Sequence, residues 1–390
     1  MIVSGEYAIC DKCIAQFGNL IQDHFPVKKN SKKPTLPSPV KLKSYLDQYV
    51  VGQEPAKIAL CVSIANHYKR MLYEHDNEIS KSNLLIAGPT GSGKSLLVST
   101  VAKFLNVPYI SVDVTSLTEA GYVGQNIDTI ISRLLVEANG DINLAENGII
   151  FLDEIDKIAS GKSRNPIADG KVSGIQSGLL KIIEGTKVAV PFGMESMKKM
   201  VRAIEVDTSN ILFIAGGAFV GLDEIVKRRL KKKSGIGFSD TQKEWKNLEN
   251  EYTTDDFIEY GLEPEFMGRF PMRTYTTELT EKELATVFGV KNSILDEYKF
   301  YFNVDGIDLD FSSDFIQRVV QKARHEKTGV RGLKAICESI ITTHLYLIPE
   351  YQKRNVAKLT FTGDCLDKET LPRIEIFQKT LKKLDEKSVL

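Results

Sequence analysis

The feature that most constrains this chain is a glycine-rich turn that directly follows an apolar run. Leu84-Leu85-Ile86-Ala87 is typical of a buried strand, and the eight residues after it fit the pattern GxxxxGK[ST]: Gly88, Pro89, Thr90, Gly91, Ser92, Gly93, Lys94 and Ser95. The glycines let backbone N–H groups point at phosphate oxygens. Lys94 adds positive charge, and the Ser95 hydroxyl can ligate Mg²⁺. Because a helical pattern follows, its positive end would face the same anion. The segment therefore predicts a site for ATP with Mg²⁺.

A second apolar run ends in two acidic residues. Ile149 to Leu152 is followed by Asp153 and Glu154. Ligands of α/β proteins lie at the carboxyl ends of the strands, so both carboxylates would face the phosphate-binding turn. We expect Asp153 to hold Mg²⁺ and Glu154 to orient and activate the attacking water. The adjacent Asp156 and Lys157 are expected to be solvated or structural.

Short apolar runs alternate with helical stretches along the first two thirds of the chain. The runs at 84–87, 148–152 and 211–215 are each bounded by polar residues or glycine. Buried strands of a parallel sheet have this character, so the pattern predicts a doubly wound α/β core. After about Thr277 the strand signal fades, which predicts a smaller, mostly helical C-terminal domain. Its expected elements are helices at 281–290, 293–301, 313–324 and 332–346 and a short strand at 357–361.

Composition narrows the class of protein. Lys+Arg and Asp+Glu number 51 each, so the formal net charge is zero and gives no global attraction to nucleic acid. No apolar run approaches the ~18 residues of a membrane span, and the N-terminus lacks a signal pattern. An odd count of five cysteines suits a reducing compartment. We expect a cytoplasmic protein whose main partner is neither a membrane nor nucleic acid.

Several further motifs follow one another along the chain. They are Tyr49–Gln53, Gly121–Gly124 (GYVG), Gly235–Phe238 (GIGF), Gly261–Arg269 and Thr328–Leu333. Each motif alone is unspecific, but their order is hard to reach by chance, and it is the order found in the ClpX family of AAA+ protein unfoldases. From about Lys41 to Glu375 the chain resembles this family. The resemblance implies an N-terminal zinc-module-like segment (1–25), a linker (26–40), a large AAA+ ATPase domain (41–276), a small sensor-2 domain (277–375) and a tail (376–390).

The resemblance also implies an activity and a set of roles. It implies a ring of six subunits that hydrolyses ATP, unfolds protein substrates and feeds them through a central pore to a Clp peptidase. Val51 and Gly52 would lie near the adenine. Arg331 would reach the nucleotide from the small domain. Arg269 would be an arginine finger aimed at the neighbouring subunit's nucleotide, although the residues alone favour a surface ion pair with Glu263 or Glu265.

Two loops would contact polypeptide partners in such a motor. Gly121, Tyr122, Val123 and Gly124 would form the pore loop, whose aromatic tip can press on any polypeptide without reading its sequence. Ile236, Gly237 and Phe238 would dock the peptidase, because two large apolar residues in a polar stretch often mark a partner pocket. The alternatives are an ordinary glycine turn and a loop that folds back on its own domain. The basic run at 227–233 is expected to be a solvated helix face.

The chain departs from the family pattern in three places. Cys10 and Cys13 form only one CxxC pair, whereas a closed structural zinc site needs four ligands. His24 is a conceivable third ligand and no fourth is near, so a shortened module that binds zinc poorly or not at all is expected. Met197-Lys198-Lys199-Met200 stands where the family tends to carry an Arg-Lys-His loop. No polar sensor-1 residue is evident after Ala215, where two glycines follow.

Other functions remain open at the level of the sequence. An HslU-type unfoldase also carries a GYVG loop, but the stretch between Asp153 and Asn210 is too short for that family's inserted domain. A nucleic-acid-dependent AAA+ motor would share the ATPase core, and neutral charge argues against it. A non-proteolytic protein-remodelling factor and an inactive homologue are the remaining alternatives.

Overall fold

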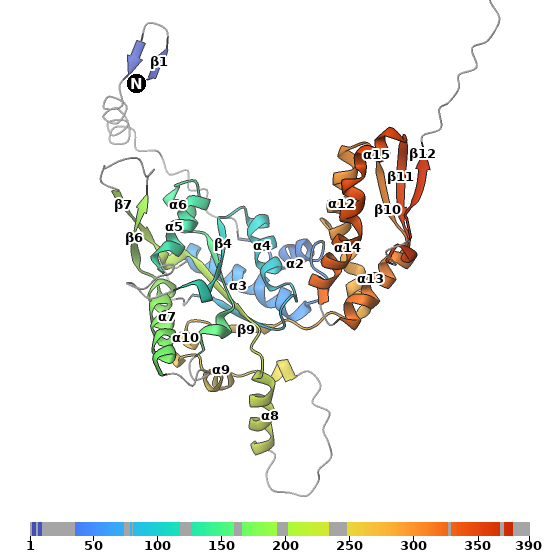
Figure 1. Cartoon of the computed structure of the whole chain (residues 1–390). Helices are drawn as coiled ribbons and strands as arrows, with labels where there is room; N and C mark the ends of the chain where they lie inside the picture. The colour runs from blue at the N-terminus through green and yellow to red at the C-terminus, as the bar shows by residue number, and fades with distance from the viewer. Residues whose placement is uncertain are drawn as a thin grey trace, which may run out of the picture.

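The computed structural model describes residues 2–4, 7–9, 36–73, 79, 81–117, 127–159, 166–192, 202–233, 248–326, 329–366 and 370–376. Its centre is a five-stranded parallel sheet in the order β4-β5-β8-β3-β9 (Figure 1). The strands are β3 (Leu84–Ala87), β4 (Tyr109–Asp113), β5 (Ile149–Asp153), β8 (Leu212–Gly217) and β9 (Met272–Tyr275). The predicted parallel α/β core is confirmed. Because β8 lies between β3 and β5, the ends of these three strands meet at one edge of the sheet.

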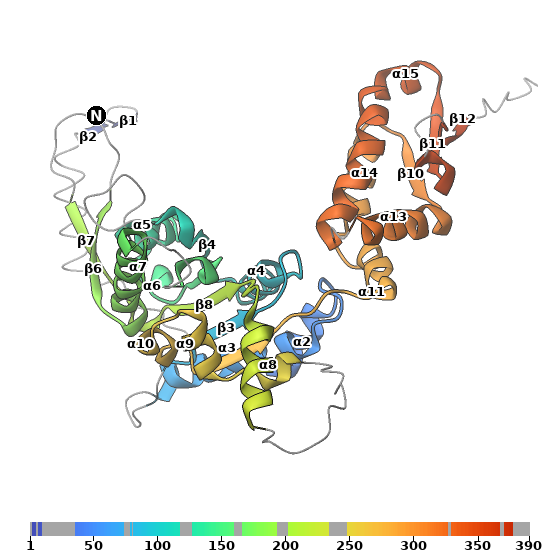
Figure 2. The same cartoon turned by 60° about the horizontal axis from the view of Figure 1, so that its bottom comes forward.

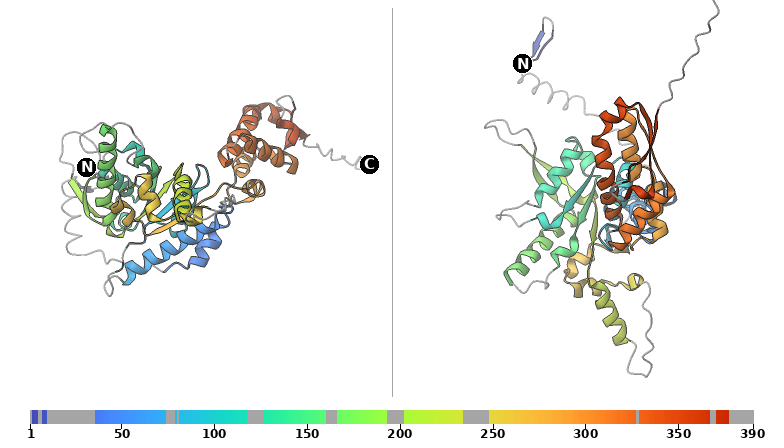
Figure 3. Two further views of the ribbon diagram at one scale, coloured as in Figure 1. Left: turned by 90° about the horizontal axis from the view of Figure 1, so that it is seen from below. Right: turned by 45° about the vertical axis from the view of Figure 1, so that its right-hand side comes forward.

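Both faces of the sheet are covered by helices, which explains why its central strands are apolar throughout. On one face lie α2 (Pro39–Leu46), α3 (Glu54–Tyr73) and α4 (Lys94–Leu105); α2 and α3 are the blue helices of Figure 3. They share a core with Leu84, Ile86 and Phe151. The alternate residues Leu85, Ile150 and Phe213 enter a second core on the opposite face. The helices around that core are α5 (Asp128–Glu137), α6 (Ile142–Ala145), α7 (Pro166–Glu184), α8 (Leu222–Lys233), α9 (Thr254–Tyr260) and α10 (Pro264–Gly268).

Two antiparallel hairpins lie outside the central sheet. One pairs β6 (Lys187–Phe192) with β7 (Arg202–Asp207), and the other pairs β1 (Ile2–Ser4) with β2 (Tyr7–Ile9). The edge strands β4 and β9 and both hairpins were not predicted from the sequence. Edge strands carry exposed residues on part of their surface, so they lack the continuous apolar run of β3, β5 and β8.

The C-terminal unit has its own core and stands beside α2 and α4, away from α5 and α7 (Figures 1 and 2). Its helices are α11 (Glu281–Thr286), α12 (Ile294–Val304), α13 (Ser313–His325), α14 (Gly329–Tyr346) and α15 (Ile348–Lys353). Side chains of Thr280, Ser293 and Ser312 cap the first, second and third of these. The separate core supports the proposed division at residues 276 and 277.

The C-terminal unit contains more sheet than the sequence predicted. Besides the expected strand, seen as β11 (Val356–Phe361), it has β10 (Asp308–Phe311) and β12 (Arg373–Ile376) in the order β10-β11-β12. β10 carries two aspartates and β12 is largely exposed, so neither shows an apolar run in the sequence. Their pairing with the more apolar β11 decides their conformation.

Candidate functional site: a phosphate loop between two units

The glycine-rich turn leaves β3 at the carboxyl edge of the sheet and leads into α4. Gly88, Gly91 and Gly93 all have positive φ, which side-chain-bearing residues rarely adopt. At Gly88 an added Cβ would overlap the hydroxyl and carbonyl oxygens of Thr276. Only glycine therefore lets the turn pass this close to the segment that joins the two units.

Lys94 is held inside the turn. Its side chain is 7% exposed, and Nζ donates to the carbonyl oxygens of Gly88 at 2.6 Å and Pro89 at 2.9 Å. Burial lowers the pKa of Lys94, while the negative charges of Asp153 and Asp156 oppose that shift. Ser95, in the first turn of α4, is exposed and free of the core. A cationic amine and a hydroxyl thus lie on the concave side of a loop suited to an anion.

The two acidic residues lie at the carboxyl end of β5, and the single strand β8 separates β5 from β3 and its phosphate loop. Asp153 ends β5, and its Oδ1 accepts from the backbone N–H of Glu154 at 2.9 Å. Glu154 is exposed and has a left-handed φ of 58°, a conformation that is uncommon for a non-glycine residue and is often found at functional sites. Between them and the loop, β8 presents Gly216, where an added Cβ would lie 2.5 Å from the Phe151 ring. No side chain can stand at that position without moving the ring.

Asp156 is structural and not solvated. It is 2% exposed, and its Oδ1 accepts from the backbone N–H of Ala218 at 3.0 Å, just beyond β8. The carboxylate therefore fixes the end of the strand that separates the phosphate loop from Asp153. Lys157 is exposed and lies 3.7 Å from Asp156. Of the two roles expected for Asp156, solvated or structural, the structure shows the structural one.

One cavity of about 430 Å³ is lined by part of the predicted ATP site, with residues from both units. Its lining includes Lys94, Ser95, Asp153, Glu154 and, from α14 of the C-terminal unit, Arg331. Arg331 is close enough that a Cβ on Gly91 would lie 3.6 Å from its Cγ. A neighbouring cavity of about 630 Å³ lies between the same loop and the C-terminal unit, with Leu279, Leu284 and Val330 in its wall. Both cavities carry charged side chains, and the phosphate loop contributes to the lining of each.

The connection between the units is tied to the phosphate loop. The buried hydroxyls of Thr276 and Ser92 lie 2.6 Å apart, and the Thr276 N–H donates to Ala87 O at 2.8 Å. The Gln53 side chain donates to Thr277 O at 2.8 Å and accepts from Thr277 N at 2.9 Å. Thr276 and Thr277, the first residues of the connection, are thus hydrogen-bonded to the phosphate-loop segment and to Gln53, respectively.

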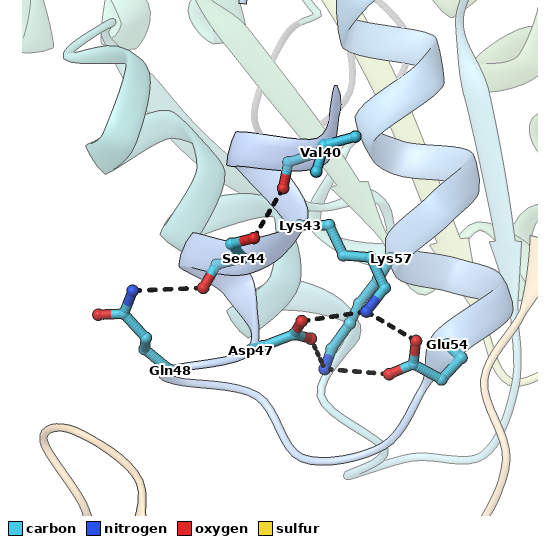
Figure 4. A network of polar contacts seen from close by, with 7 residues as sticks. All are labelled: Val40, Lys43, Ser44, Asp47, Gln48, Glu54 and Lys57. Carbon is cyan, nitrogen blue, oxygen red and sulfur yellow. Dashed lines mark hydrogen bonds and ion pairs between the residues drawn. The ribbon is translucent and has the colours of Figure 1, made fainter. Parts of the chain in front are cut away.

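Val51 and Gly52 are not part of the lining of either cavity. A Cβ on Gly52 would lie 2.6 Å from Glu283 and 3.5 Å from the Leu279 side chain that lines the cavity. Figure 4 shows the charged network that holds this α2–α3 turn. Lys57 Nζ lies 2.6 Å from Asp47, and Lys43 Nζ lies 3.0 Å from Asp47 and 2.8 Å from Glu54. Partial burial raises the pKa of Asp47, but hydrogen bonds from the two lysines outweigh it and leave that pKa below its usual value.

Arg269 lies at the opposite edge of the sheet from the phosphate loop of its own chain. It follows α10, and its carbonyl accepts from Asn83, the residue before β3, at 3.0 Å. The loop begins five residues later, which at ~3.3 Å per residue is ~16 Å along the strand, farther than an arginine side chain reaches. The guanidinium, half exposed, pairs with Glu184 at 2.5 Å. The expected partners Glu263 and Glu265 are replaced by a residue far earlier in the chain.

The site suits Mg²⁺ that arrives with a nucleotide. Mg²⁺ prefers oxygen ligands and is commonly bound by one or two protein groups together with phosphate oxygens and water. The Ser95 hydroxyl and the second Asp153 oxygen are such groups. Across the described ranges no cluster of three or more His, Cys, Asp or Glu side chains could hold a metal ion alone. Cys10 and Cys13 lie outside those ranges, so weak or absent zinc binding stays a prediction.

Three other predicted features also lie outside the described residues. They are the pore loop Gly121–Gly124, the docking segment Ile236–Phe238 and Met197–Met200. The basic helix α8 is described in part: Arg228 pairs with Glu259, and Arg229 lies 2.8 Å from Asp256. Arg228 is exposed, as expected for a solvated helix face, whereas Arg229 is largely covered by α9, which corrects that part of the expectation for the run 227–233.

Sequence reasoning assigned no role to four residues that shape the site: Gln53, which it named only as the end of a motif, and Asn83, Thr276 and Lys334. Lys334 lies one turn after Arg331 on α14, and helical spacing could have indicated it. The other three act through contacts with residues more than 100 positions away, for which the sequence carries no signal. Among the described helices, none is long and apolar enough to cross a membrane.

Comparison with known proteins places these features in context. A family model described as "AAA domain (Cdc48 subfamily)" matches residues 79–273. A Treponema denticola protein named "ATP-dependent Clp protease ATP-binding subunit ClpX" is 43% identical over 361 residues, covering 90% of this chain and 86% of that protein. Proteins of the same name from Bacteroides fragilis and Porphyromonas gingivalis are 41% and 40% identical, over 94% and 91% of this chain and 92% and 90% of their own lengths.

Proposed function

This chain belongs to the ClpX family of AAA+ ATPases, and from that premise we propose that it uses ATP to unfold proteins for a Clp peptidase. The observation that carries the proposal is the cavity in which Lys94, Asp153, Glu154 and Arg331 meet. It joins a phosphate cradle, two carboxylates and an arginine from a second unit, which are the parts an ATP-driven motor needs.

Each residue of the cavity has a chemical task. Lys94 and the loop N–H groups hold the β- and γ-phosphates, and Ser95 and Asp153 hold Mg²⁺. When bound, the metal neutralises charge on the phosphate oxygens. Glu154 orients and activates the attacking water, a role that its exposed position beside Asp153 supports. Gly52 adjoins Leu279 in the wall of the larger cavity, which supports an adenine position there, near Val51 and Gly52.

The complete site needs a neighbouring subunit. Arg269 lies at the edge of the sheet away from its own phosphate loop, so it can serve as an arginine finger only for another subunit. A head-to-tail contact of this kind closes into a ring, and the family implies six subunits. Release of Arg269 from Glu184 would free the guanidinium for the neighbour's γ-phosphate.

Nucleotide state would be coupled to the angle between the two units. Arg331 approaches the site from the C-terminal unit, and Thr276 ties the connection to Ser92 of the loop. A shift of the loop would therefore reach the connection directly. The pore loop around Tyr122 would convert that movement into a pull on a protein substrate.

The docking role of Ile236, Gly237 and Phe238 rests on the sequence and on the element before them. Helix α8 projects away from the sheet, which supports a contact with a partner by the segment that follows (Figure 1). A cytoplasmic location and the lack of a nucleic-acid partner stay predictions, as does the expectation for zinc.

The test is degradation of a folded fluorescent reporter that carries an unstructured terminal tag. The chain, a Clp peptidase and Mg²⁺-ATP should together abolish fluorescence and yield peptides, whereas the chain with Glu154→Gln should not. Loss of fluorescence without peptides would indicate a remodelling factor. ATPase activity that rises only with DNA or RNA, with the reporter untouched, would contradict the proposal.

A further inference from the structure

Asn83 connects three parts of the sheet at its amino edge. The side chain is 1% exposed, and its Nδ2 donates to the carbonyl oxygen of Arg269 at 3.0 Å. Its Oδ1 accepts from the backbone N–H of Phe213, in β8, at 3.2 Å. Both halves of the amide are thus used, one by the arginine segment and one by the strand next to β3. Buried amides with two such partners hold their neighbours in one geometry.

The other backbone hydrogen bonds of the segment that Asn83 holds are local: Arg269 N–H donates to Phe266 O and Phe270 N–H donates to Met267 O, both at 3.1 Å. Arg269 stands between the five-residue helix α10 and the edge strand β9, whose ladder begins only at Met272. The side-chain pair with Glu184 is about half exposed on both sides, and pairs of this kind fix a position weakly. Phe266 and Phe270 are fully buried and set the depth of the segment. The bond from Asn83 links the Arg269 backbone to a buried side chain of the central sheet.

Strand β3 reaches from Asn83 to the phosphate loop. All four of its residues are buried, and it is paired with β8 on one side and β9 on the other. A strand held on both edges and both faces moves as a rigid element. Its carboxyl end leads into the phosphate loop of its own subunit. Its amino end follows Asn83, which bonds Arg269, the proposed finger for the next subunit.

We propose that Asn83 is a positioning residue for Arg269, and that β3 with Asn83 links each subunit's own phosphate loop to the finger it presents to its neighbour. This inference rests on the role in the neighbouring site proposed above for Arg269. A displaced finger leaves nucleotide binding intact but loses its stabilisation of charge in the transition state.

Two variants separate positioning from folding. Asn83→Asp keeps the size and the acceptor for Phe213 but lacks the amide donor, and Asn83→Ala removes both bonds. Asn147→Ala is the matched control, because Asn147 also donates to a backbone carbonyl, that of Asn143, but lines neither cavity and makes that bond within its own turn. We expect both Asn83 variants to lower kcat for ATP by up to ~100-fold, the typical effect of a misplacement of about 1 Å, with KM and the affinity for an ATP analogue changed less than about threefold. The control should keep wild-type kcat.

Mixed rings supply a readout that a merely structural role would not change. Lys94→Ala subunits have a defective site but an intact finger. Mixing them with either Asn83 variant should restore part of the ATPase activity, because some interfaces then pair an intact site with a well-placed finger. Arg269→Ala mixed with Lys94→Ala is the reference.

The outcomes distinguish the two ideas. If the reference mixture recovers activity and the Asn83 mixtures do not, Asn83 acts within its own subunit and the inference is wrong. Wild-type kcat in both variants, or failure of both to form rings, also overturns it. If the reference mixture fails although mixed rings form, the finger role of Arg269 has failed and the inference falls with it, while the reporter assay still decides the overall function.

Discussion

Buried His67 should make the stability of the large α/β unit depend on pH. The side chain lies in α3 and is 3% exposed, and burial lowers its pKa to about 3, with the positive charges of Arg70 and Lys81 adding to the effect. A hydrogen bond to the backbone of Asn210 opposes the shift. Nδ1 has no hydrogen-bond partner among the described residues. The folded protein therefore keeps this ring neutral.

The sign and size of the effect follow from the two states. In the unfolded chain histidine has a pKa of about 6.5. Below that pH the unfolded state therefore binds a proton that the folded state does not bind. Stability is complete above about pH 6.5 and falls until the pH reaches about 3. Between pH 7.5 and pH 5, linkage gives a loss of about 2 kcal/mol from this one residue.

Urea unfolding at pH 7.5 and pH 5, followed by circular dichroism without nucleotide, measures the loss. Wild-type protein should lose about 2 kcal/mol more than His67→Gln over this interval. His325→Gln is the control, because His325 is exposed on α13 and its loss should leave the wild-type pH dependence. Burial also lowers the pKa of His344, but its contribution is common to all three proteins. Equal pH dependence in wild type and His67→Gln would refute the reasoning.

Three further predictions concern the motor itself. Glu154→Gln should bind ATP normally and hydrolyse it ~10²–10⁴-fold more slowly, measured by phosphate release; wild-type turnover would contradict its role. Gly88→Ala should weaken ATP binding by at least roughly tenfold, because the new methyl group overlaps Thr276, whereas Gly289→Ala, with open space around it, should bind as wild type in a fluorescent-nucleotide titration. Phe238→Ala should keep ATPase and unfolding activity but lose degradation by the peptidase, since a buried phenylalanine contributes ~1.5–3 kcal/mol per docked loop and the loops of the proposed six-subunit ring would act together. Normal degradation by that variant would exclude the docking role.

The sequence predicted the elements whose signal is local. The strands β3, β5 and β8 were found because burial on both faces demands an uninterrupted apolar run. Four of the five described C-terminal helices, α11 to α14, were found from their apolar spacing, to within a few residues at each end, whereas α15 was not predicted. Edge strands β4 and β9, and β10 and β12 of the C-terminal unit, were missed. Their residues pair only through partners distant in the chain, so their composition alone is ambiguous.

The residues of the candidate site also divide into those that a local sequence signal indicated and those that it did not. The chemistry of Lys94 and Ser95 could be assigned from sequence because a phosphate loop is contiguous, and its backbone geometry requires glycine at fixed spacing. Asp153 and Glu154 followed because a buried strand delivers them to the same edge. The role of Arg331 was inferred only from the family resemblance. The structure shows that its side chain lies beside Gly91 of the loop. The pore and docking loops lie outside the described residues and stay predictions.

Only the tertiary structure decided what lies at each end of β3. The order of the strands separates Arg269 from the phosphate loop of its own chain and so favours a neighbour as its target. Asn83 and Arg269 are 186 positions apart, and Ser92 and Thr276 are 184 apart. Hydrogen bonds between residues so distant in the chain form only when the packed cores bring the two segments together. No local sequence pattern predicts that packing. The sequence by itself determined which chemistry the chain can carry out, and the packing of β3 between β8 and β9 decided which residues hold that chemistry in place.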